Sequence, residues 1–358
     1  MDGNEKSVLI AMSGGVDSSV AAFLMQRSGY ECTGATMKLY RSGPDGEMRM
    51  ERDIEDARST AGKLGIPFLA PDLSEDFKRL VVDDFVREYE SGRTPNPCVV
   101  CNRTMKFGKL MEIADGLGIR YLATGHYART SYDPERKRYV LRKGTDPLKD
   151  QSYMLYGLSQ EQLSRVIFPL GGMTKTEVRE IASRNGLPSA LRRDSQDICF
   201  IPGRDYVSFL EEYTGNVYQP GNFVDSSGNV LGTHRGAVRY TIGQRRGLGI
   251  SEGERMYVLG KDMKANTVTL GKREEVFSIG AAARNVNWVS VSGISGPRRV
   301  GARIRYSSSE IKGTAEPMED GVRVIFDEPQ KAVTPGQSLV MYDGDEVLGG
   351  GIITEPVR

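Results

Sequence analysis

The stretch that decides the fold is LIAMSGGVDSS, residues 9–19. It begins within an apolar run of strand length, Val8–Met12, and apolar residues at helical spacing resume over Val20–Met25. Between these two runs lie adjacent glycines, Gly14 and Gly15. Glycine has no Cβ and adopts positive φ without strain, so the chain is predicted to approach another group closely at this turn.

The turn is predicted to bind phosphate. If Met12 ends a buried strand and Asp17 opens a helix, the backbone N–H groups between them lack intrahelical partners and lie at the positive end of the helix dipole. Asp17 is a candidate ligand for a magnesium ion that bridges phosphates. Three hydroxyls add donors, those of Ser13, Ser18 and Ser19. The loop is not a Walker A sequence, because it lacks Gly-Lys-Ser/Thr.

Composition sets limits on the class of protein. The chain has 358 residues, of which 39% are hydrophobic, and this predicts a buried core divided over two or three domains. The formal net charge is +1, so any nucleic-acid surface has to be local. The N-terminal apolar run lacks a cleavage pattern, and no stretch approaches the roughly 20 apolar residues of a membrane span. We therefore expect a cytoplasmic protein that does not associate with membranes.

The N-terminal part alternates between strand and helix patterns, which predicts an α/β fold with a parallel sheet covered by helices on both faces. The predicted strands are Val8–Met12, Cys32–Leu39, Pro67–Leu73 and Tyr121–His126. The predicted helices are Asp17–Arg27, Asp53–Leu64, Glu75–Glu90 and Phe107–Leu117. A further helix is predicted over Lys175–Arg184, with Thr174 as its N-cap and Gly186 just beyond its end.

After about Tyr213 the pattern changes to short alternating runs such as NTVTLG and GARIRYS, separated by Gly, Asn, Asp and Ser. Such runs are typical of a sandwich or barrel. We therefore expect an α/β domain at 1–204, a small central mixed or β domain at 205–275, and a β-barrel domain at 276–358.

Three of the four cysteines are candidates for chemistry. Cys98 and Cys101 lie in TPNPCVVCN, whose two prolines predict an extended or turned segment until after Asn102. A C-x-x-C pair has three uses, as metal ligands, as a redox pair, or as two small buried side chains. Cys199 follows Arg192 and Arg193, which would favour its thiolate if they lie close. Cys32, within a predicted strand, is expected to be inert core.

SGGVDSS resembles the pyrophosphate-loop motif of the ATP pyrophosphatases, which cleave ATP between its α and β phosphates and transfer AMP to an oxygen. Over essentially the full chain the sequence resembles one family of this group, the tRNA-specific 2-thiouridylases. The strings that carry the resemblance occur in the family's order: AMSGGVDSS, TPNPCVVCN, KFG, ATGHYAR, KDQSYML, MTKTEVREIA, DSQDICFIPG and YTIGQRRGLG. The resemblance implies an ATP-binding, catalytic pyrophosphate-loop domain (adenine-nucleotide α-hydrolase-like), a central tRNA-binding domain and a C-terminal β-barrel.

The resemblance also implies an activity. ATP adenylates O2 of the wobble uridine in tRNAs for lysine, glutamate and glutamine, and a persulfide sulfur then replaces that oxygen, which leaves with AMP. Cys199 is implied to carry the persulfide and Cys101 to be its partner, so that a Cys101–Cys199 disulfide remains. The implied partners are the tRNA anticodon loop and a sulfur donor such as a cysteine desulfurase or sulfur-relay protein.

Position 98 departs from part of the family, in which the matching residue is an aspartate proposed to assist acid-base steps. A second mechanism therefore stays open, in which Cys98, Cys101 and Cys199 hold a four-iron iron-sulfur cluster. Two other readings also stay open. One is a pyrophosphate-loop ligase acting on a small molecule with structural cysteines, and the other is an RNA-binding or iron-sulfur protein without catalysis.

The resemblance places ATP and tRNA contacts on particular residues. The implied ATP contacts are Ala11, Met12, Ser13, Gly14, Gly15, Val16, Asp17, Ser18, Met37 and Gly125. The implied tRNA contacts are Asn96, Pro97, Cys98, Lys149, Asp150, Gln151, Arg305 and Tyr306. Alone, Met37 is typical of core and Gly125 of a turn, and His126 is expected to satisfy local backbone groups.

Two arginine clusters without carboxylates suit phosphate contacts along a folded RNA, although each alone is typical of a solvated face. The first cluster is Arg235, Arg239, Arg245 and Arg246, and the second is Arg298, Arg299, Arg303 and Arg305.

Overall fold

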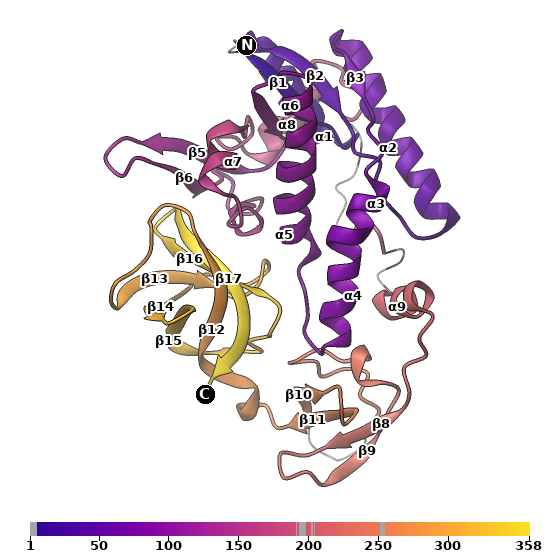
Figure 1. Cartoon of the computed structure of the whole chain (residues 1–358), viewed down its shortest axis with the longest axis vertical. Helices are drawn as coiled ribbons and strands as arrows, with labels where there is room; N and C mark the ends of the chain where they lie inside the picture. The colour runs from indigo at the N-terminus through magenta and orange to yellow at the C-terminus, as the bar shows by residue number, and fades with distance from the viewer. Residues whose placement is uncertain (1–5, 191, 193–197, 202, 204, 251–254) are drawn as a thin grey trace.

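The structure, a computed structural model, describes residues 6–190, 192, 198–201, 203, 205–250 and 255–358. It has three parts (Figure 1): a parallel sheet with its helices at one end, a small β module at the other end, and a barrel beside them. The predicted fold class is confirmed. No helix in the described ranges is long and apolar enough to cross a membrane.

The N-terminal sheet is parallel throughout, with strand order β3-β2-β1-β4-β7. Its strands are β1 (Ser7–Ala11), β2 (Glu31–Ala35), β3 (Phe68–Leu69), β4 (Tyr121–Thr124) and β7 (Val166–Ile167). β1 is central, and Val8, Leu9 and Ile10 are fully buried. The chain leaves β1 toward β2 and later returns on its other side as β4. Ligands of open parallel sheets bind at the carboxyl edge beside such a reversal of strand order.

Three helices flank this sheet: α1 (Val16–Arg27), α2 (Gly43–Leu64) and α8 (Lys175–Arg184). α8 has the predicted bounds, and Thr174 forms a capping box with Glu177. α2 begins ten residues before its predicted start. Ser42 takes the N-cap position, and a proline, which is favourable in a first turn, follows it.

Two longer helical runs contain π-helical turns. The first is α3 (Ser74–Phe77), η1 (Lys78–Val82) and α4 (Asp83–Glu90), and the second is α5 (Pro97–Cys101), η2 (Asn102–Lys109) and α6 (Leu110–Gly116). The prediction that the segment stays extended until after Asn102 is therefore wrong. Pro97 occupies the first turn of α5, where the missing N–H needs no partner, and Asn96 before it is extended. Cys98 and Cys101 consequently lie on a helix.

The central module contains one helix and a four-stranded sheet of order β10-β11-β8-β9. Its elements are α9 (Tyr206–Thr214), β8 (Gly221–Val224), β9 (Val230–His234), the short η5 (Ala237–Arg239), β10 (Tyr257–Asp262) and β11 (Thr267–Gly271). Phe223, Val258 and Val268 are fully buried at its centre.

The C-terminal part is a six-stranded barrel, and its sheet is closed because β12 pairs with both β15 and β17. After the short η6 (Glu274–Val276) its strands are β12 (Phe277–Trp288), β13 (Arg298–Arg303), β14 (Ile311–Met318), β15 (Gly321–Lys331), β16 (Ser338–Asp343) and β17 (Glu346–Val357). The small remaining elements of the N-terminal part are β5 (Ala128–Asp133), β6 (Arg138–Lys143), η3 (Ser152–Met154) and α7 (Gln160–Arg165).

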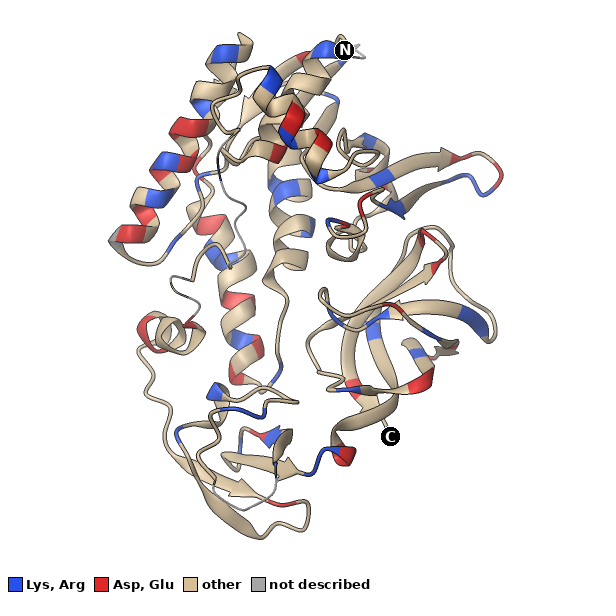
Figure 2. Cartoon of the chain, turned by 180° about the vertical axis from the view of Figure 1, so that it is seen from behind, with Lys and Arg blue, Asp and Glu red and all other residues tan. Residues whose placement is uncertain are grey.

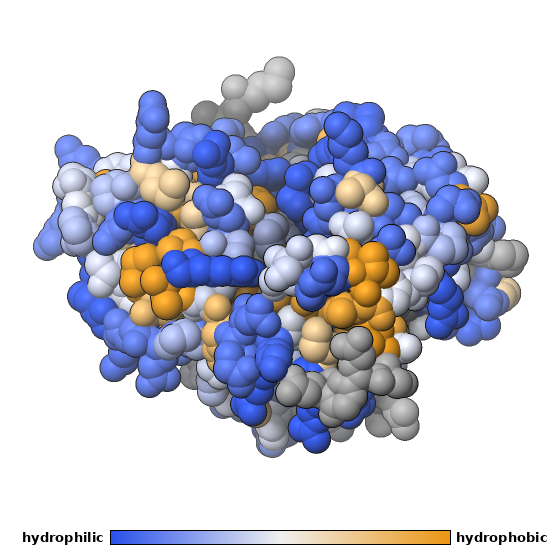
Figure 3. Space-filling view, turned by 90° about the horizontal axis from the view of Figure 1, so that it is seen from below, coloured by the Kyte–Doolittle hydropathy of each residue, from blue (hydrophilic) through white to orange (hydrophobic). Residues whose placement is uncertain are grey.

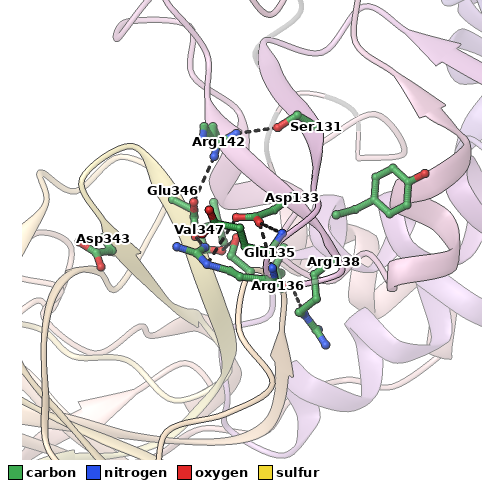
Figure 4. A network of polar contacts seen from close by, with 12 residues as sticks. Ser131, Asp133, Glu135, Arg136, Arg138, Arg142, Asp343, Glu346 and Val347 are labelled. Atoms are coloured by element: carbon green, nitrogen blue, oxygen red, sulfur yellow. Dashed lines mark hydrogen bonds and ion pairs between the residues drawn. The ribbon is translucent and has the colours of Figure 1, made fainter.

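The β5–β6 hairpin connects the N-terminal part to the barrel through strand pairing and polar contacts (Figure 4). β6 pairs with β17 through Arg142 and Glu346. The Glu346 carboxylate is mostly buried and accepts hydrogen bonds from Arg136 and from Arg142, the latter at 3.3 Å. Arg138 donates to the backbone oxygen of Trp288 at 2.9 Å. The barrel is therefore held against the N-terminal part by partly buried, charge-assisted contacts.

The surface carries no single block of one charge. Figure 2 shows lysine and arginine distributed over all three parts and interspersed with aspartate and glutamate. The face seen in Figure 3 is mostly hydrophilic, with hydrophobic groups confined to small separate clusters. Charge alone therefore does not locate a ligand, and the site has to be found from local geometry.

Candidate functional site

The phosphate-binding loop lies between β1 and α1, at the carboxyl edge of the sheet. Gly14 has φ +72°, in the left-handed region, and a Cβ on it would lie 2.7 Å from the backbone oxygen of Asp53. Gly15 is the N-cap of α1, and no side chain caps this helix end. The first N–H groups of a twelve-residue helix are thus left for another acceptor. This geometry suits a phosphate.

The serines of the loop differ in role. Ser18 and Ser19 are buried, and both hydroxyls donate to the backbone oxygen of Gly15, at 3.1 and 2.9 Å. The Ser13 N–H donates to Ser18 Oγ at 3.1 Å. The expectation that all three hydroxyls face the ligand is therefore corrected, because two of them shape the loop and only Ser13 is exposed.

Gly125 abuts the same helix end from the neighbouring strand. It follows β4, and a Cβ on it would lie 2.8 Å from both the carbonyl carbon of Asp17 and the backbone nitrogen of Ser18. Backbone atoms do not yield as side-chain ends do, so only glycine fits here. Gly125 thus fixes the distance between β4 and the start of α1.

We predict that Gly125→Ala displaces the first turn of α1. Overpacking of this kind costs about 1–3 kcal/mol, and the displaced amides should weaken ATP binding by about tenfold or more. Isothermal titration with ATP measures the effect. Gly172→Ala is the matched control, because a Cβ on Gly172 would meet nothing within 4 Å beyond its own chain neighbours. Equal ATP affinities of the two variants would contradict the assignment.

Met37 lies where an adenine would be expected, two residues beyond β2, and is partly buried. The ends of β1 and β2 are joined here, since the Thr36 hydroxyl donates to the Met12 backbone oxygen at 2.7 Å and the Met12 N–H donates to Ala35 at 2.8 Å. Met37 contacts two of the hydrophobic clusters of the N-terminal part. Its side chain therefore packs between two parts of the core at the carboxyl end of β2.

Asp17 lies in the first turn of α1 and has two partners that local sequence patterns did not predict. Lys175 Nζ lies 2.8 Å from each of its carboxylate oxygens, and the Tyr127 hydroxyl donates to Oδ1 at 2.7 Å. Both partners belong to strings quoted above, ATGHYAR and MTKTEVREIA. Nothing in the sequence indicates that these strings meet at Asp17, because the contacts span more than one hundred residues.

Arg192 also reaches the loop. It donates to the Gly14 backbone oxygen at 3.1 Å and pairs with Asp56 at 2.6 Å and with Asp53. The condition under which Arg192 would favour the thiolate of Cys199 is therefore not met, because two carboxylates hold Arg192 at the phosphate loop. Arg193 lies outside the described residues.

The three candidate cysteines come together beside α5. Phe200 is almost fully buried, packs against Phe85 of α4 at a ring distance of 5.3 Å and shares a hydrophobic cluster with Cys101, which anchors Cys199 near α5. Cys98 and Cys199 are exposed, whereas Cys101 is buried, and all are free thiols. The implied Cys101–Cys199 disulfide is therefore not formed in this state.

Burial keeps these thiols protonated. Burial raises the pKa of Cys101 to about 12 and that of Cys199 to about 11, and it raises the pKa of Cys98 as well. The thiols also influence one another, because Cys98 and Cys199 further raise the pKa of Cys101. They therefore lie within electrostatic reach of each other.

Lys106 joins the cysteines to the sheet edge. Its charge lowers the pKa of all three thiols, in part offsetting burial. Its Nζ lies 3.5 Å from His126 Nε2, and His126 Nδ1 lies 2.7 Å from the Thr124 hydroxyl at the end of β4. Burial, helped by Lys106, holds the pKa of His126 well below its usual range. Neutral His126 is thus satisfied locally, but by the side chains of Thr124 and Lys106 and not by the backbone groups that were expected.

The barrel holds the segment before Cys98. Gln337 donates to the backbone oxygen of Thr94 at 2.8 Å, and the Thr94 N–H donates to Pro335 at 2.9 Å. Gly336, between Pro335 and Gln337, has φ +92°, and a Cβ on it would lie 2.8 Å from the backbone nitrogen of Thr94. Asn96, half-buried, contacts Met154, and Pro97 is buried. The barrel and the N-terminal part therefore position the cysteine-bearing helix together.

The other candidate tRNA residues gather at this place. The charges of Asp150 and Cys98 raise the pKa of Tyr306, after burial, and Lys149 lowers it, so the four side chains are neighbours. Tyr306 is 40% exposed. Gln151 pairs with the backbone of Tyr127, accepting from its N–H at 3.0 Å.

Asp150 itself is buried, and its carboxylate accepts hydrogen bonds from Gly144, from Ser152 and, at 3.1 Å, from Arg303. With these protein donors on both oxygens, its side chain braces the loop.

The second arginine cluster is largely neutralised by carboxylates distant in sequence. Arg298 pairs with Asp343 at 2.9 Å, Arg299 with Asp327 at 2.5 Å, and Arg303 with Asp150. Arg305 is exposed and bonds only weakly, at 3.4 Å, to a backbone oxygen.

In the first cluster Arg239 pairs with Glu211. Within the described ranges, no carboxylate pairs with Arg235, Arg245, Arg246 or Arg305, all of which are exposed. The expected patches thus reduce to these four cations.

Comparison with known proteins covers nearly the whole chain. Three family profiles match: the tRNA methyl transferase HUP domain over residues 6–203, the tRNA methyl transferase PRC-barrel domain over 207–272, and the aminomethyltransferase beta-barrel domain over 279–353. Two curated relatives, each named tRNA-specific 2-thiouridylase MnmA, come from Acetivibrio thermocellus and Clostridioides difficile. The first is 48% identical, covering 98% of this chain and 99% of its own, and the second 45%, covering 97% and 98%.

Solved structures are more distant. The U34-tRNA thiolase NcsA from Methanococcus maripaludis with its [4Fe-4S] cluster is 18% identical, with a TM-score of 0.37, over 60% of this chain and 67% of that chain. An NMN synthetase from Francisella tularensis is 15% identical, with a TM-score of 0.35, over 60% and 79%. Similarity at this level decides neither function nor cofactor.

Proposed function

Since the chain belongs to the tRNA-specific 2-thiouridylase (MnmA) family, we propose that it converts the wobble uridine of tRNAs for lysine, glutamate and glutamine to 2-thiouridine, using ATP. One observation carries the proposal: Lys106 and His126 connect three clustered cysteines to the sheet edge that bears the phosphate loop. An activated oxygen and a sulfur nucleophile can meet there.

The first step is adenylation. The uridine O2 attacks the α phosphorus, an O–P bond forms, and pyrophosphate leaves with the electrons of the broken P–O bond. The ATP residues proposed above surround this step, with the open amides of α1 toward the phosphates and Met37 toward the adenosine. Magnesium commonly binds one or two carboxylates together with substrate phosphates, so Asp17 fits as its ligand, and the ion would screen phosphate charge.

The second step transfers sulfur. The terminal sulfur of a Cys199 persulfide attacks C2, and AMP leaves with the original oxygen. The Cys101 thiolate then attacks Sγ of Cys199, which breaks the S–S bond, leaves sulfur on C2 and forms a Cys101–Cys199 disulfide. A thiol reductant resets the pair. Because burial raises the pKa of Cys101 to about 12 even with Lys106 nearby, its activation needs the bound substrate.

The iron-sulfur mechanism is less well supported. Cys98, Cys101 and Cys199 all lie in the described part of the chain, yet no group of three His, Cys, Asp or Glu side chains there is arranged to hold a metal ion. We therefore derive no step through a cluster.

We infer that the anticodon loop lies across Asn96–Cys98, Lys149–Gln151 and Arg305–Tyr306, an inference supported by the mutual influence of Cys98, Lys149, Asp150 and Tyr306. A cysteine desulfurase or sulfur-relay protein is the proposed sulfur donor, and the cytoplasm, where tRNA is modified, is the proposed location. Domain borders are proposed at 204/205 and 275/276.

Arg305→Ala is expected to weaken tRNA binding uniformly and to lower the slope of log affinity against log salt by about 1, because one phosphate contact is lost. Filter binding over a salt series measures both. Arg299→Ala is the matched control, since Asp327 already neutralises Arg299. Equal slopes for the two variants would remove Arg305 from the interface.

Unmodified tRNA, ATP and a persulfide donor test the proposed function directly. We expect AMP to form only with tRNA present and to match 2-thiouridine in amount. AMP formation without RNA would favour the ligase acting on a small molecule, and no pyrophosphate release at all would favour a protein without catalysis.

A further inference from the structure

The phosphate loop carries no cation of its own. Its charged residue is Asp17, whereas a nucleoside triphosphate brings several negative charges. Within the described ranges, two cations from elsewhere in the chain reach the loop, Lys175 and Arg192. Whichever of these two cations leaves its present partner when the nucleotide binds can neutralise the pyrophosphate.

Arg192 is the less suitable of the two. It is held by the carboxylates of Asp53 and Asp56 and by the backbone oxygen of Gly14. Turning it toward a ligand would leave two carboxylates without this partner. Its contacts instead keep the loop in its left-handed turn.

Lys175 is placed differently. It is the first residue of α8, so its ammonium group is carried by the positive end of a helix dipole, where a cation is disfavoured. The Asp17 carboxylate offsets this, with Nζ 2.8 Å from both oxygens. The Lys175 side chain is 11% exposed, whereas that of Asp17 is 32% exposed. The exposed part of the pair is thus mainly the Asp17 carboxylate.

The sheet order indicates which part of the nucleotide meets this pair. Met37 follows β2, on one side of β1, whereas Gly125 and Tyr127 follow β4, on the other side, and both contact Asp17. If the adenosine lies toward Met37, the phosphates run across the end of β1 toward β4. Lys175 is then at the far end of the nucleotide, where the β and γ phosphates lie.

We infer that Lys175 is the pyrophosphate-binding lysine of this site, held by Asp17 until ATP binds. This rests on the proposed function, because it assumes that the loop binds ATP. On ATP binding, the ammonium exchanges the Asp17 carboxylate for the β and γ phosphate oxygens, and the freed carboxylate would be available to hold a magnesium ion. The ammonium then stabilises the charge that pyrophosphate gains as it leaves.

Binding measurements test the inference without turnover. The probes are α,β-methylene-ATP, which cannot be cleaved at the reacting bond, pyrophosphate and AMP. Lys175→Met should weaken the binding of α,β-methylene-ATP and of pyrophosphate by about 10- to 100-fold. The affinity for AMP should stay within about twofold, because AMP lacks the β and γ phosphates. Lys175→Arg should regain part of the loss. Lys63→Met, which removes a lysine bound to the Gly186 backbone oxygen, should change none.

A double variant separates binding from structure, with Asp17→Asn as its reference because that change alone is expected to weaken nucleotide binding. If Lys175 only compensates Asp17, adding Lys175→Met to Asp17→Asn should cause no further loss of affinity for α,β-methylene-ATP. If Lys175 holds pyrophosphate, it should cause a further loss of about tenfold or more. Equal losses for AMP and for α,β-methylene-ATP in Lys175→Met, or no loss at all, would overturn the inference. Failure of the unaltered protein to bind α,β-methylene-ATP would instead overturn the ATP assignment, and this inference with it.

Discussion

Cys199→Ala is expected to abolish 2-thiouridine formation, by about 10³-fold or more, while tRNA-dependent pyrophosphate release continues. In the part of the chain that the structure describes, no hydrogen bond joins Cys199 to the phosphate loop or α1, so activation of the uridine should survive its loss. The sulfur that replaces O2 would have no carrier, and adenylated tRNA would be hydrolysed. Mass spectrometry of digested tRNA and a pyrophosphate assay measure the two steps separately.

Cys32→Ala is the matched control. Cys32 is a buried thiol in β2, and burial raises its pKa to about 11, so it shares the protonation state of Cys199 without its position. Its removal should leave both steps intact apart from a modest loss of stability. If Cys199→Ala retained thiolation, the persulfide would have to be elsewhere and the proposed relay would be wrong.

Asp17→Asn is expected to impair adenylation and to spare sulfur loading, which is the reverse of Cys199→Ala. The loss should be about 10²-fold or more in kcat/KM for ATP. The amide keeps the shape of the side chain but removes the charge that pairs with Lys175 and that is proposed to hold magnesium. Sulfur loading of Cys199 should be unaffected, because the persulfide forms away from the loop. Pyrophosphate release with saturating tRNA and varied ATP measures the loss.

Asp45→Asn is a suitable control for this variant. Asp45 also lies in the first turn of a helix of the same part of the molecule, but it is exposed. Its substitution should leave adenylation unchanged. Full adenylation by Asp17→Asn would exclude the loop as the triphosphate site.

Local sequence signals predicted the elements that bear the site. The apolar run, two glycines and the following helical spacing were enough for β1, the loop and α1, because strand, turn and helix each depend on neighbours along the chain. α8 was predicted with its bounds, since Thr174 and Glu177 form a capping box.

The error at Pro97 was local as well. Proline breaks a helix when it lies in the interior but is favourable in the first turn. The sequence alone does not show which of these positions Pro97 takes. Reading it as a breaker placed Cys98 and Cys101 in a loop instead of on α5.

Contacts between distant segments were beyond the sequence. Arg298 and Arg299 appeared free of carboxylates because Asp343 and Asp327 come from other strands of the barrel. Lys175 and Tyr127 meet Asp17 only once the sheet has assembled. Such pairs leave no periodicity or spacing, so no local pattern indicates them.

The central claim is that sulfur passes through a cysteine persulfide. The most direct test purifies the protein without oxygen, counts iron and labile sulfide per chain, and follows a single turnover of unmodified tRNA with ATP and a sulfur source. We expect full activity without iron and a persulfide trapped on Cys199. Stoichiometric iron, with activity lost on its removal and restored on reconstitution, would contradict the claim and make Cys98, Cys101 and Cys199 cluster ligands.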